Sequence, residues 1–340
     1  MSCYVGLDSS KKHTSICVID KTGKALKEGS VETSPAAIAK FLRGDRLRYS
    51  RVGLEAWTLA PWLYEGLARR GFPVVCIDAA HAHNVLKTQP NKTDKADARG
   101  IAELMRIGSF RAVHVKTRES QRIHAVLTAR RLLKTKQIAI QNAIGGALLG
   151  LGLKLERGRR GTFEERVRKL ASKDALAKCA LEPLLEVRAL IAAKIGEMDR
   201  SMRETAQADP VCQVLMTAPG IGALGALAFK SAIDVPNRFQ NSRSIGPHLG
   251  LVPRTHQSGE TERRGRISRR GDSEVRRMLY LAALVVLRHD VKTSWLKRWG
   301  EQIAARRGGK RAAVAVARRL TIVLHRMWVT QTPFRWELTA

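Results

Sequence analysis

The stretch Asn91-Lys92-Thr93-Asp94-Lys95-Ala96-Asp97-Ala98 carries the most informative pattern of this 340-residue chain. Thr93 or Asp94 is a suitable N-cap for the helix that the following residues predict, and Pro90 cannot lie inside that helix. Asp94 and Asp97 are three residues apart and therefore share one face of the first turn. A hard divalent cation such as Mg²⁺ would relieve the repulsion between their carboxylates. Taken alone, such a pair is more often two solvated acids that stabilise a helix N-terminus.

Upstream of this stretch, the sequence predicts a mixed α/β sheet. Apolar and β-branched runs indicate strands, and the first three are close enough in sequence to form an antiparallel meander. Helices alternate with the later strands, and the first helix has Ser34 as its N-cap and Pro35 at its first position. The predicted strands are 3–7, 14–19, 25–33, 51–54 and 73–77, and the predicted helices are 35–43 and 59–70.

Two further acids end predicted strands, since Asp8 follows the first strand and Glu55 follows the fourth. In open α/β sheets, ligands bind at the carboxyl ends of the strands. Asp8 and Glu55 could therefore converge with Asp94 and Asp97. Four carboxylates in one place would hold two Mg²⁺ ions, and two-metal sites catalyse phosphodiester chemistry. Each acid alone is more often a cap of a turn or helix.

The charge balance points to nucleic acid as the partner. Lysine and arginine number 61 against 30 aspartate and glutamate, and the net charge of +31 repels itself unless an anion binds. The basic residues are spread over the whole length, which argues against an amphipathic segment that lies on a membrane. Hydrophobic residues make up 44%, which is enough for a folded core.

Cysteine usage predicts a reducing compartment. The five cysteines are an odd number without a C-x-x-C pair, which argues against a disulfide framework and a structural zinc site. Cys3, Cys17 and Cys76 lie in apolar runs and are expected in the core. The sequence shows no signal-peptide h-region and no apolar run long enough for a bilayer. We therefore expect a cytoplasmic protein that associates with the nucleoid when it acts on DNA.

The middle of the chain predicts two long helices, at about 120–149 and 163–204, joined by a loop rich in glycine and arginine. Apolar residues recur at helical spacing in both. In the second helix the expected apolar face contains Leu184, Val187, Leu190, Ile191, Ile195 and Met198. Such an αα-hairpin suits either packing within the chain or a coiled-coil arm for dimerisation. The spacing is not a strict heptad, so the two interpretations remain equal.

Two later stretches suit phosphate binding. Residues 215–226 fit a helix-hairpin-helix, in which Gly220 and Gly222 would let backbone amides approach a phosphate, although helix–helix turns also favour glycine. Residues 254–271 read as a loop rich in glycine and arginine before a helix at 272–288. Such a loop suits flexible guanidinium groups around a phosphate, or a disordered basic linker.

Downstream of that helix, Trp295 and Trp299 stand among basic residues. Aromatic side chains in a basic context suit base stacking in nucleic-acid-binding proteins. Two tryptophans four residues apart are as often one face of a helix that packs on a core. The sequence leaves both interpretations open.

In this order and spacing, the pieces resemble transposases of the insertion-sequence one-ten type, the Piv/MooV-like DEDD family that includes bridge-RNA-guided recombinases. The resemblance spans nearly the whole chain. Its acidic motifs are Gly6-Leu7-Asp8-Ser9-Ser10-Lys11, Leu54-Glu55-Ala56 and the stretch 91–98. The second half matches at Pro219-Gly220-Ile221-Gly222, Arg238-Phe239, Leu249-Gly250-Leu251-Val252-Pro253, Gln257-Ser258-Gly259 and Ile267-Ser268-Arg269-Arg270-Gly271.

The resemblance implies three domains. A RuvC-like (RNase H-type) α/β domain would cover 1–115, and a long α-helical coiled-coil arm would cover 116–208. A mostly α-helical transposase domain, with the helix-hairpin-helix-like element and the serine loop, would cover 209–340. The implied partners are donor and target DNA, an element-encoded guide RNA and further copies of the chain in a dimer or tetramer, with no membrane.

The resemblance also implies the catalytic residues. Asp8, Glu55, Asp94 and Asp97 would bind Mg²⁺, and Ser258 would attack DNA and form a covalent phosphoserine link. Composition alone would not choose Ser258 over the other serines nearby. A serine hydroxyl needs activation, which metal ions and arginines could supply. This requires the two domains to meet at the DNA, in one subunit or between subunits. The expected phosphate clamps are Arg254, Arg264 and Arg266.

One departure follows the second acidic motif, where many relatives carry a small residue and a glycine. This chain has Trp57-Thr58-Leu59 there. Two other functions also fit the sequence. One is a RuvC-like nuclease that hydrolyses DNA with metal-activated water, and the other is a non-catalytic basic protein that only binds nucleic acid.

Overall fold

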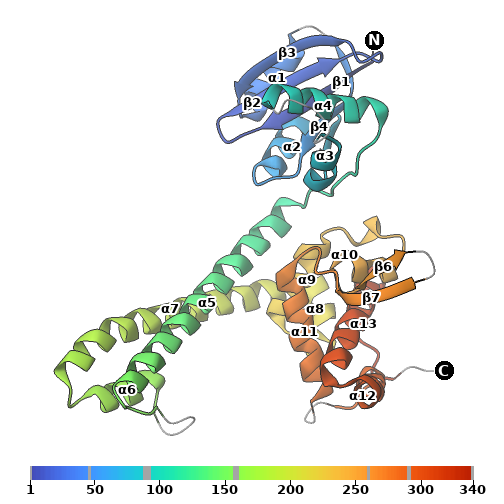
Figure 1. Ribbon diagram of the computed structural model, residues 1–340. Helices are drawn as coiled ribbons and strands as arrows, with labels where there is room; N and C mark the ends of the chain where they lie inside the picture. The colour runs from blue at the N-terminus through green and yellow to red at the C-terminus, as the bar shows by residue number, and fades with distance from the viewer. Residues whose placement is uncertain are drawn as a thin grey trace. The chain divides into compact units, whose positions relative to one another are not determined.

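The computed structural model describes residues 2–44, 47–86, 93–155, 161–258, 261–288 and 292–337, without the side chains of His256, Ser258, Glu262 and Arg264. Pro90, Asn91 and Lys92 therefore lie outside the described residues. By the contacts among described residues, the chain divides into two compact units, Met1–Lys116 and Thr117–Ala340 (Figure 1). Each has hydrophobic clusters of its own.

Within the described residues, the first unit forms a sheet of five strands in the order β3-β2-β1-β4-β5. The first three strands are antiparallel neighbours, as predicted for a meander. β1 and β4 are parallel, and so are β4 and β5. The predicted mixed α/β sheet is confirmed. The strands are β1 (Ser2–Ser9), β2 (His13–Ile19), β3 (Ala25–Glu32), β4 (Arg48–Glu55) and β5 (Val74–Ile77).

Helices cover both faces of this sheet (Figure 1). α1 (Pro35–Arg43) and α2 (Ala60–Ala68) bury Ile38 and Leu63 against Val5 and Leu7 on one face. α4 (Asp94–Ile107) covers the other face, and α3 (Ala79–Leu86) follows β5. The Ser34 side chain accepts a hydrogen bond from the amide of residue 37, so the predicted N-cap of α1 is confirmed.

The second unit begins with an arm of three helices, α5 (Arg118–Gly150), α6 (Phe163–Ala171) and α7 (Ala175–Ala208). The predicted single helix at 163–204 is wrong, because the chain breaks at 172–174 and Asp174 caps a new helix with bonds to two backbone amides. α5 and α7 pack along each other at both ends of the arm, where they share separate clusters of buried apolar residues.

The predicted apolar face of α7 is partly wrong. Val187 is 46% exposed and Leu190 is 60% exposed, whereas Leu181, Leu185 and Ile195 are buried. The sequence offers two overlapping apolar stripes on this helix, and contacts with α5 and α6 select one of them. Spacing within a single helix does not contain that information.

The rest of the second unit is a helical domain around the buried Phe229. Its helices are α8 (Pro210–Met216), α9 (Ala223–Ile233), η1 (Pro236–Arg238), η2 (Ser242–Ser244), α10 (Ile245–His248), α11 (Ser273–Leu287), α12 (Trp295–Arg307) and α13 (Gly309–Thr330). The mostly helical character expected of this half is confirmed.

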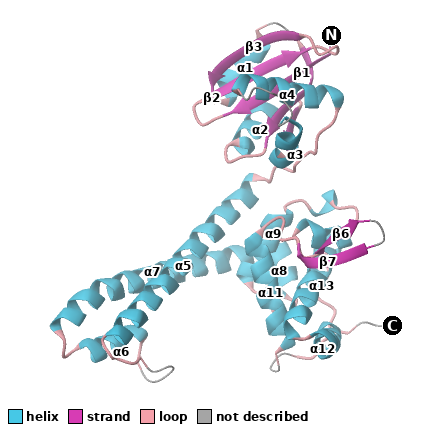
Figure 2. Cartoon of the chain, in the orientation of Figure 1, coloured by secondary structure: helices cyan, strands magenta, loops and turns pink. Residues whose placement is uncertain are grey.

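One element of this half contradicts the sequence prediction. Most of the loop predicted at 254–271 is an antiparallel hairpin of β6 (Pro253–Ser258) and β7 (Thr261–Ile267), shown in magenta among the helices of Figure 2. Strands are held by backbone pairing across the ladder, so a ribbon without an apolar face can form although its composition resembles a loop.

Three cysteines are buried as predicted, and burial also affects their chemistry. Burial raises the pKa of Cys17 and of Cys76 to about 11, with a contribution from Glu28 at Cys17. Burial likewise raises the pKa of Cys3. These thiols therefore stay protonated at neutral pH.

Among the helices that the structure describes, we find no segment with the length and apolar character of a membrane span.

Candidate functional site

Glycines let α4 lie unusually close to the sheet. Gly6 and Gly53 are register partners on β1 and β4. A Cβ at Gly6 would come within 1.9 Å of the carbonyl oxygen of Ala98, and a Cβ at Gly53 within 2.7 Å of Met105 Cγ. Ala98 and Met105 of α4 therefore face the sheet, and the backbone of α4 lies directly against β1.

The direction of α4 follows from contacts at its far end. Arg51 of β4 donates a hydrogen bond to the carbonyl of Met105 over 2.8 Å, and Glu103 lies next to Gly23 in the turn between β2 and β3. That turn adjoins the N-terminal end of β1, because Ile19 pairs with Tyr4. The N-terminus of α4 therefore points toward the C-terminal end of β1.

Thr93 is the N-cap of α4, one of the two residues predicted for this role. Its side chain accepts a hydrogen bond from the amide of Ala96 over 3.1 Å. Asp94 is four residues before the buried Ala98, and Asp97 is four residues before the buried Ile101. Both acids therefore continue the stripe of α4 that faces the sheet.

The strand acids lie on the same side of the sheet as α4. Asp8 and Glu55 come one position after the register pair Leu7 and Leu54, whose side chains pack against α1 and α2. Because side chains alternate along a strand, both acids are on the opposite face, toward α4. Asp8, Glu55 and Asp97 are half-buried, and Asp94 is exposed. The four predicted acids thus share one face and one end of the sheet.

The fit to a metal ion is favourable in chemistry and incomplete in geometry. Carboxylate oxygens are the ligands that Mg²⁺ prefers. However, the described residues contain no group of three or more acidic, histidine or cysteine side chains close enough to hold a metal. Asp8 and Glu55 also have other interactions within the protein. The donor set is therefore present at one edge, without a ready-made cluster.

The departure at 57–59 leaves Glu55 in a regular strand, since Glu55 pairs with Ile77. Trp57 packs against the core beneath α1 and α2, and its buried indole N–H has no hydrogen-bond partner among the described residues. Leu59 precedes α2 without a side-chain cap. The difference from the family pattern therefore affects the start of α2 rather than the strand that carries the acid.

In the second unit, two of the matched motifs meet at the base of the β6–β7 hairpin. The amide of Ser268 donates a hydrogen bond to the carbonyl of Val252 over 2.8 Å. Gly250 and Gly271 have φ values of +67° and +72°. A Cβ on Gly250 would be 2.3 Å from the carbonyl oxygen of Arg270. Only glycine fits there, which gives a physical reason for both motifs.

Arg276 of α11 stabilises the base of the hairpin through hydrogen bonds, and the sequence did not predict this role. Its Nη1 donates hydrogen bonds to the carbonyls of Leu249, Arg270 and Gly271 over 3.2, 2.5 and 3.0 Å. Burial lowers the pKa of this guanidinium, while Asp272 acts in the opposite direction. A single arginine in a helix gives no sequence signal for such a role.

Ser258 is the last residue of β6, and its backbone pairs with Thr261 across the tip of the hairpin. Its side chain and that of Arg264 lie outside what the structure describes. Arg266 is exposed on β7, and Arg254 donates a hydrogen bond to the carbonyl of Ser268 over 3.1 Å. The predicted nucleophile and its basic neighbours thus belong to one ribbon.

The two glycines of the predicted helix-hairpin-helix differ. Gly220 has φ +78°, and a Cβ there would lie 2.6 Å from the carbonyl oxygen of Ala282 in α11, so packing alone requires glycine. Gly222 is the N-cap of α9, which has no side-chain cap, and no described atom outside its own neighbourhood lies within 4 Å of a Cβ there. A phosphate role for either glycine stays a prediction.

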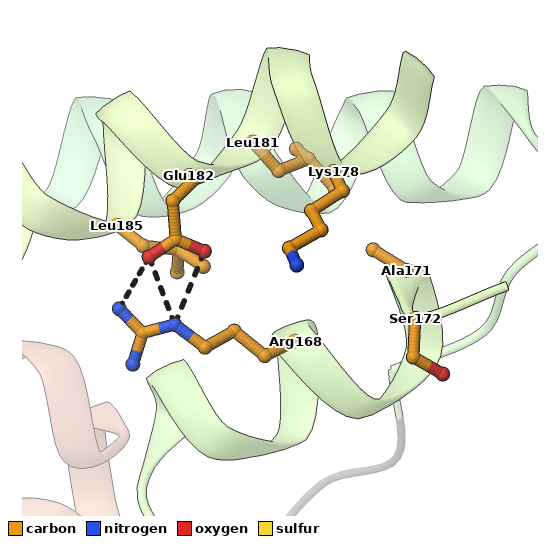
Figure 3. A pocket seen from close by; sticks show the side chains of 7 residues that line it. All are labelled: Arg168, Ala171, Ser172, Lys178, Leu181, Glu182 and Leu185. Carbon is orange, nitrogen blue, oxygen red and sulfur yellow. Dashed lines mark hydrogen bonds and ion pairs between the residues drawn. The ribbon is translucent and has the colours of Figure 1, made fainter. Parts of the chain in front are cut away.

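A pocket of about 180 Å³ lies in the arm between α6 and α7 (Figure 3). Arg168 spans it and makes hydrogen bonds with both carboxylate oxygens of Glu182. This guanidinium is already paired with a carboxylate. We therefore interpret the pocket as a gap between packed helices of the arm and not as a ligand site.

Comparison with known proteins assigns the chain to a family. The model of a DEDD transposase domain, described as "Transposase", matches residues 5–152, and the model of the "Transposase IS116/IS110/IS902 family" matches residues 212–298. The transposase for insertion sequence element IS1111A of Coxiella burnetii is 31% identical over 97% of this chain and 91% of its own length. The chain belongs to the IS116/IS110/IS902 transposase family.

Two further proteins are similar to this transposase, one over nearly its whole length and one over about a third of it. A probable family 20 transposase of Pseudomonas aeruginosa is 28% identical over 97% of the chain and 98% of its own length. The pilin gene-inverting protein of Moraxella bovis is 27% identical over 36% of the chain and 38% of its own length. Membership implies a DNA substrate.

Proposed function

We propose that this transposase mobilises an insertion sequence by cutting and rejoining DNA strands through a covalent phosphoserine at Ser258, with Mg²⁺ bound by Asp8, Glu55, Asp94 and Asp97. The observation that carries the proposal is the placement of all four acids on one face and at one end of the sheet. A strand order of three antiparallel strands followed by two parallel ones supports a RuvC-like (RNase H-type) interpretation of this unit.

The acids of the first unit would act as ligands. When bound there, Mg²⁺ would lower the negative charge on a phosphate and favour loss of a hydroxyl proton. Asp97 and Asp94 approach from a helix held by Thr93, and Asp8 and Glu55 come from adjacent parallel strands. The four ligands would thus come from three elements of the same unit, α4, β1 and β4.

Ser258 of the second unit would supply the nucleophile. Its oxygen bonds to the phosphorus of the scissile phosphodiester, and the bond from phosphorus to the leaving sugar oxygen breaks. The serine proton is released, and the leaving oxygen takes up a proton as a hydroxyl. Attack by a DNA hydroxyl on the phosphoserine reverses these changes and rejoins a strand. Arg254, Arg264 and Arg266 of the hairpin would bind phosphate oxygens.

The proposal extends to partners and organisation. A guide RNA encoded by the element would select donor and target DNA by base pairing, and the net charge of +31 suits a protein that binds both nucleic acids. The helical arm, assigned to 116–208 between a domain at 1–115 and one at 209–340, would join copies of the chain in a dimer or tetramer. Exposed Val187 and Leu190 on the arm are consistent with such a contact.

An adduct assay tests the chemistry. Full-length protein is incubated with Mg²⁺ and a labelled DNA that carries the element's ends, together with RNA from its flanking region, and is then denatured. We expect a labelled protein band that is absent in Ser258→Ala and present in Ser268→Ala. Cleavage that persists in Ser258→Ala without any adduct would instead favour the nuclease that uses water.

A further inference from the structure

A second candidate site lies in the helical domain, away from the hairpin residues named above. The pocket has a volume of about 400 Å³ and is lined by residues of α12, α13, η2 and the segment that follows α13 near the C-terminus. This volume falls within the roughly 300–1,000 Å³ typical of small-ligand sites. Its lining combines aromatic and aliphatic side chains with arginines.

The floor of this pocket is apolar and aromatic. Trp295 and Phe334 stack with their ring centroids 6.3 Å apart and an angle of 15° between the rings. The indole N–H of Trp295 donates a hydrogen bond to the carbonyl of Arg335 over 3.0 Å, which fixes the ring. The other apolar lining residues come from α13 and the segment after it, and they are Ile322, Val323, Met327 and Pro333. The sequence left two roles open for Trp295, and in the structure it both packs on the core and lines a cavity.

The rim is cationic. Arg243, Arg319, Arg326 and Arg335 all line the pocket, and each is exposed. In the described part of the chain, none of them forms an ion pair, whereas Arg168 of the arm pocket does. The Arg319 guanidinium lies 5.6 Å from the ring centroid of Trp295. Four unneutralised guanidinium groups around one cavity favour an anionic occupant.

We propose that this pocket binds a single unstacked nucleotide of a single-stranded nucleic acid, with the base on the apolar floor and its phosphates on the arginine rim. An unpaired nucleotide combines a flat apolar ring with an adjacent anion, and proteins bind such bases on aromatic and guanidinium planes. Duplex phosphates alone would leave the floor in water, and acidic peptides lack a flat ring. The inference does not depend on the chemistry of Ser258.

Binding of short oligonucleotides tests the proposal. The probes are a single-stranded DNA octamer and an RNA octamer of the same sequence with one 2-aminopurine, and versions with an abasic site at that position. The full-length protein carries Ser258→Ala, so no reaction interferes. We expect 2-aminopurine fluorescence to change on binding, and the abasic version to bind about tenfold more weakly, as expected for loss of one stacked base.

Two pairs of variants on α13 separate the pocket from bulk charge. Arg326→Gln removes a rim charge, and Arg311→Gln removes an exposed charge of the same helix that does not line the pocket. Thr330→Glu adds a carboxylate to the lining, and Val329→Glu adds one at the neighbouring exposed position. We expect the pocket variant of each pair to lose about tenfold in affinity and its control less than about threefold, with equal thermal melts.

Three results would overturn the proposal. They are equal losses within each pair, unchanged affinity for the abasic probe, and displacement of the octamer by a polyglutamate peptide as effective as displacement by unlabelled octamer. Tighter binding of the DNA probe assigns the pocket to a DNA strand, and tighter binding of the RNA probe assigns it to an RNA. Both assignments support the pocket.

Discussion

At the scale of single residues, the absence of side chains matters as much as their presence. Gly6 and Gly53 are register partners on adjacent strands, and because they lack side chains α4 can pack closely on the sheet. The two acids at the start of α4 are placed by this close approach. A methyl group at Gly6 would collide with the backbone of α4, whereas one at Gly53 would collide with the side chains of Met105 and Ile101.

We therefore predict that Gly6→Ala destabilises the first unit by at least about 1–3 kcal/mol, because its Cβ would collide with the backbone of Ala98 and Ala102. Gly145→Ala in α5 is the matched control, since no other side chain lies near that position among the described residues. It should stabilise the arm by about 0.5–1 kcal/mol. Hydrogen exchange of the two units measures both effects, and an unchanged first unit in Gly6→Ala would contradict the prediction.

A second prediction concerns the acids. Asp94→Asn should abolish strand exchange and leave DNA binding largely intact, since it removes a proposed metal ligand while the Thr93 cap remains. Asp20→Asn is the control, because Asp20 lies in the turn after β2, where its hydrogen bond with Thr22 holds its pKa below the ordinary value. Exchange is measured on plasmid substrates and binding by filter retention. Full strand exchange by Asp94→Asn would contradict the proposed role of this carboxylate as a metal ligand.

Local rules explain what the sequence predicted at this scale. The caps at Ser34 and Thr93 depend on side chains within three residues of the amides that they bind, so they are readable in a short window. Arg276 contacts Leu249, which is distant in sequence, and no window around either residue shows the contact. The four acids were identified from strand ends and motif spacing, but their common face requires the register of the sheet.

At the scale of elements, the hairpin shows where composition misleads. Polar and charged residues dominate β6 and β7, and hydrophobic residues are almost absent, so no alternating pattern predicts strands. Pairing between Pro253 and Ile267 and the hydrogen bond from Ser268 to Val252 form the ribbon instead. Such pairing depends on two segments at once, whereas the long helix α5 repeats its apolar spacing within itself and was predicted nearly to its ends.

The junction of α7, α8 and α9 contains an ion pair that should make stability depend on pH. Asp209 caps α8, and its carboxylate pairs with Lys230 of α9. Burial acts to raise the pKa of Asp209, but hydrogen bonds from Lys230 and from the amide of Cys212 outweigh it and hold the pKa below the ordinary value. A depressed carboxyl pKa stabilises the fold at neutral pH, and that stability is lost as pH falls below about 3.9 and through the folded pKa.

Asp209→Asn should therefore cost about 1–3 kcal/mol at pH 7 and progressively less at acidic pH, because asparagine keeps the cap and loses only the charge. Glu197→Gln is the control, since the pair of Glu197 with Lys194 is more than half exposed. Urea unfolding between pH 3 and 7 measures the difference. A constant gap between wild type and Asp209→Asn over that range would show that the ion pair has no such role.

At the scale of the whole molecule, charge governs association. With 61 basic residues, the transposase should neutralise many phosphates at once, and each releases a counterion. We predict that affinity for DNA falls about 10³- to 10⁵-fold between 50 and 200 mM salt, as expected for roughly six to ten phosphate contacts. Anisotropy titrations at several salt concentrations measure the slope. A slope near zero would mean that most of the excess charge does not contact nucleic acid.

The fold class and the family could be predicted from the sequence alone, since they depend on composition, on local patterns of apolar residues and on short motifs in a fixed order. The pocket beside Trp295 could not, because its arginines come from η2, α13 and the segment after it. Each of these segments resembles an ordinary basic surface by itself. Their shared cavity exists only once the helices are packed.

Because the base of the β6–β7 hairpin is fixed, the length of the hairpin sets how far it extends from that base. Two glycines, one arginine and a short ladder fix where it starts, so the number of paired residues decides how far its tip reaches. One extra residue pair at this base would extend the ribbon by about 3.4 Å and turn the side chains beyond the insertion to the opposite face. The position of Ser258 at the end of β6 thus depends on how many residues the ribbon pairs between its base and its tip.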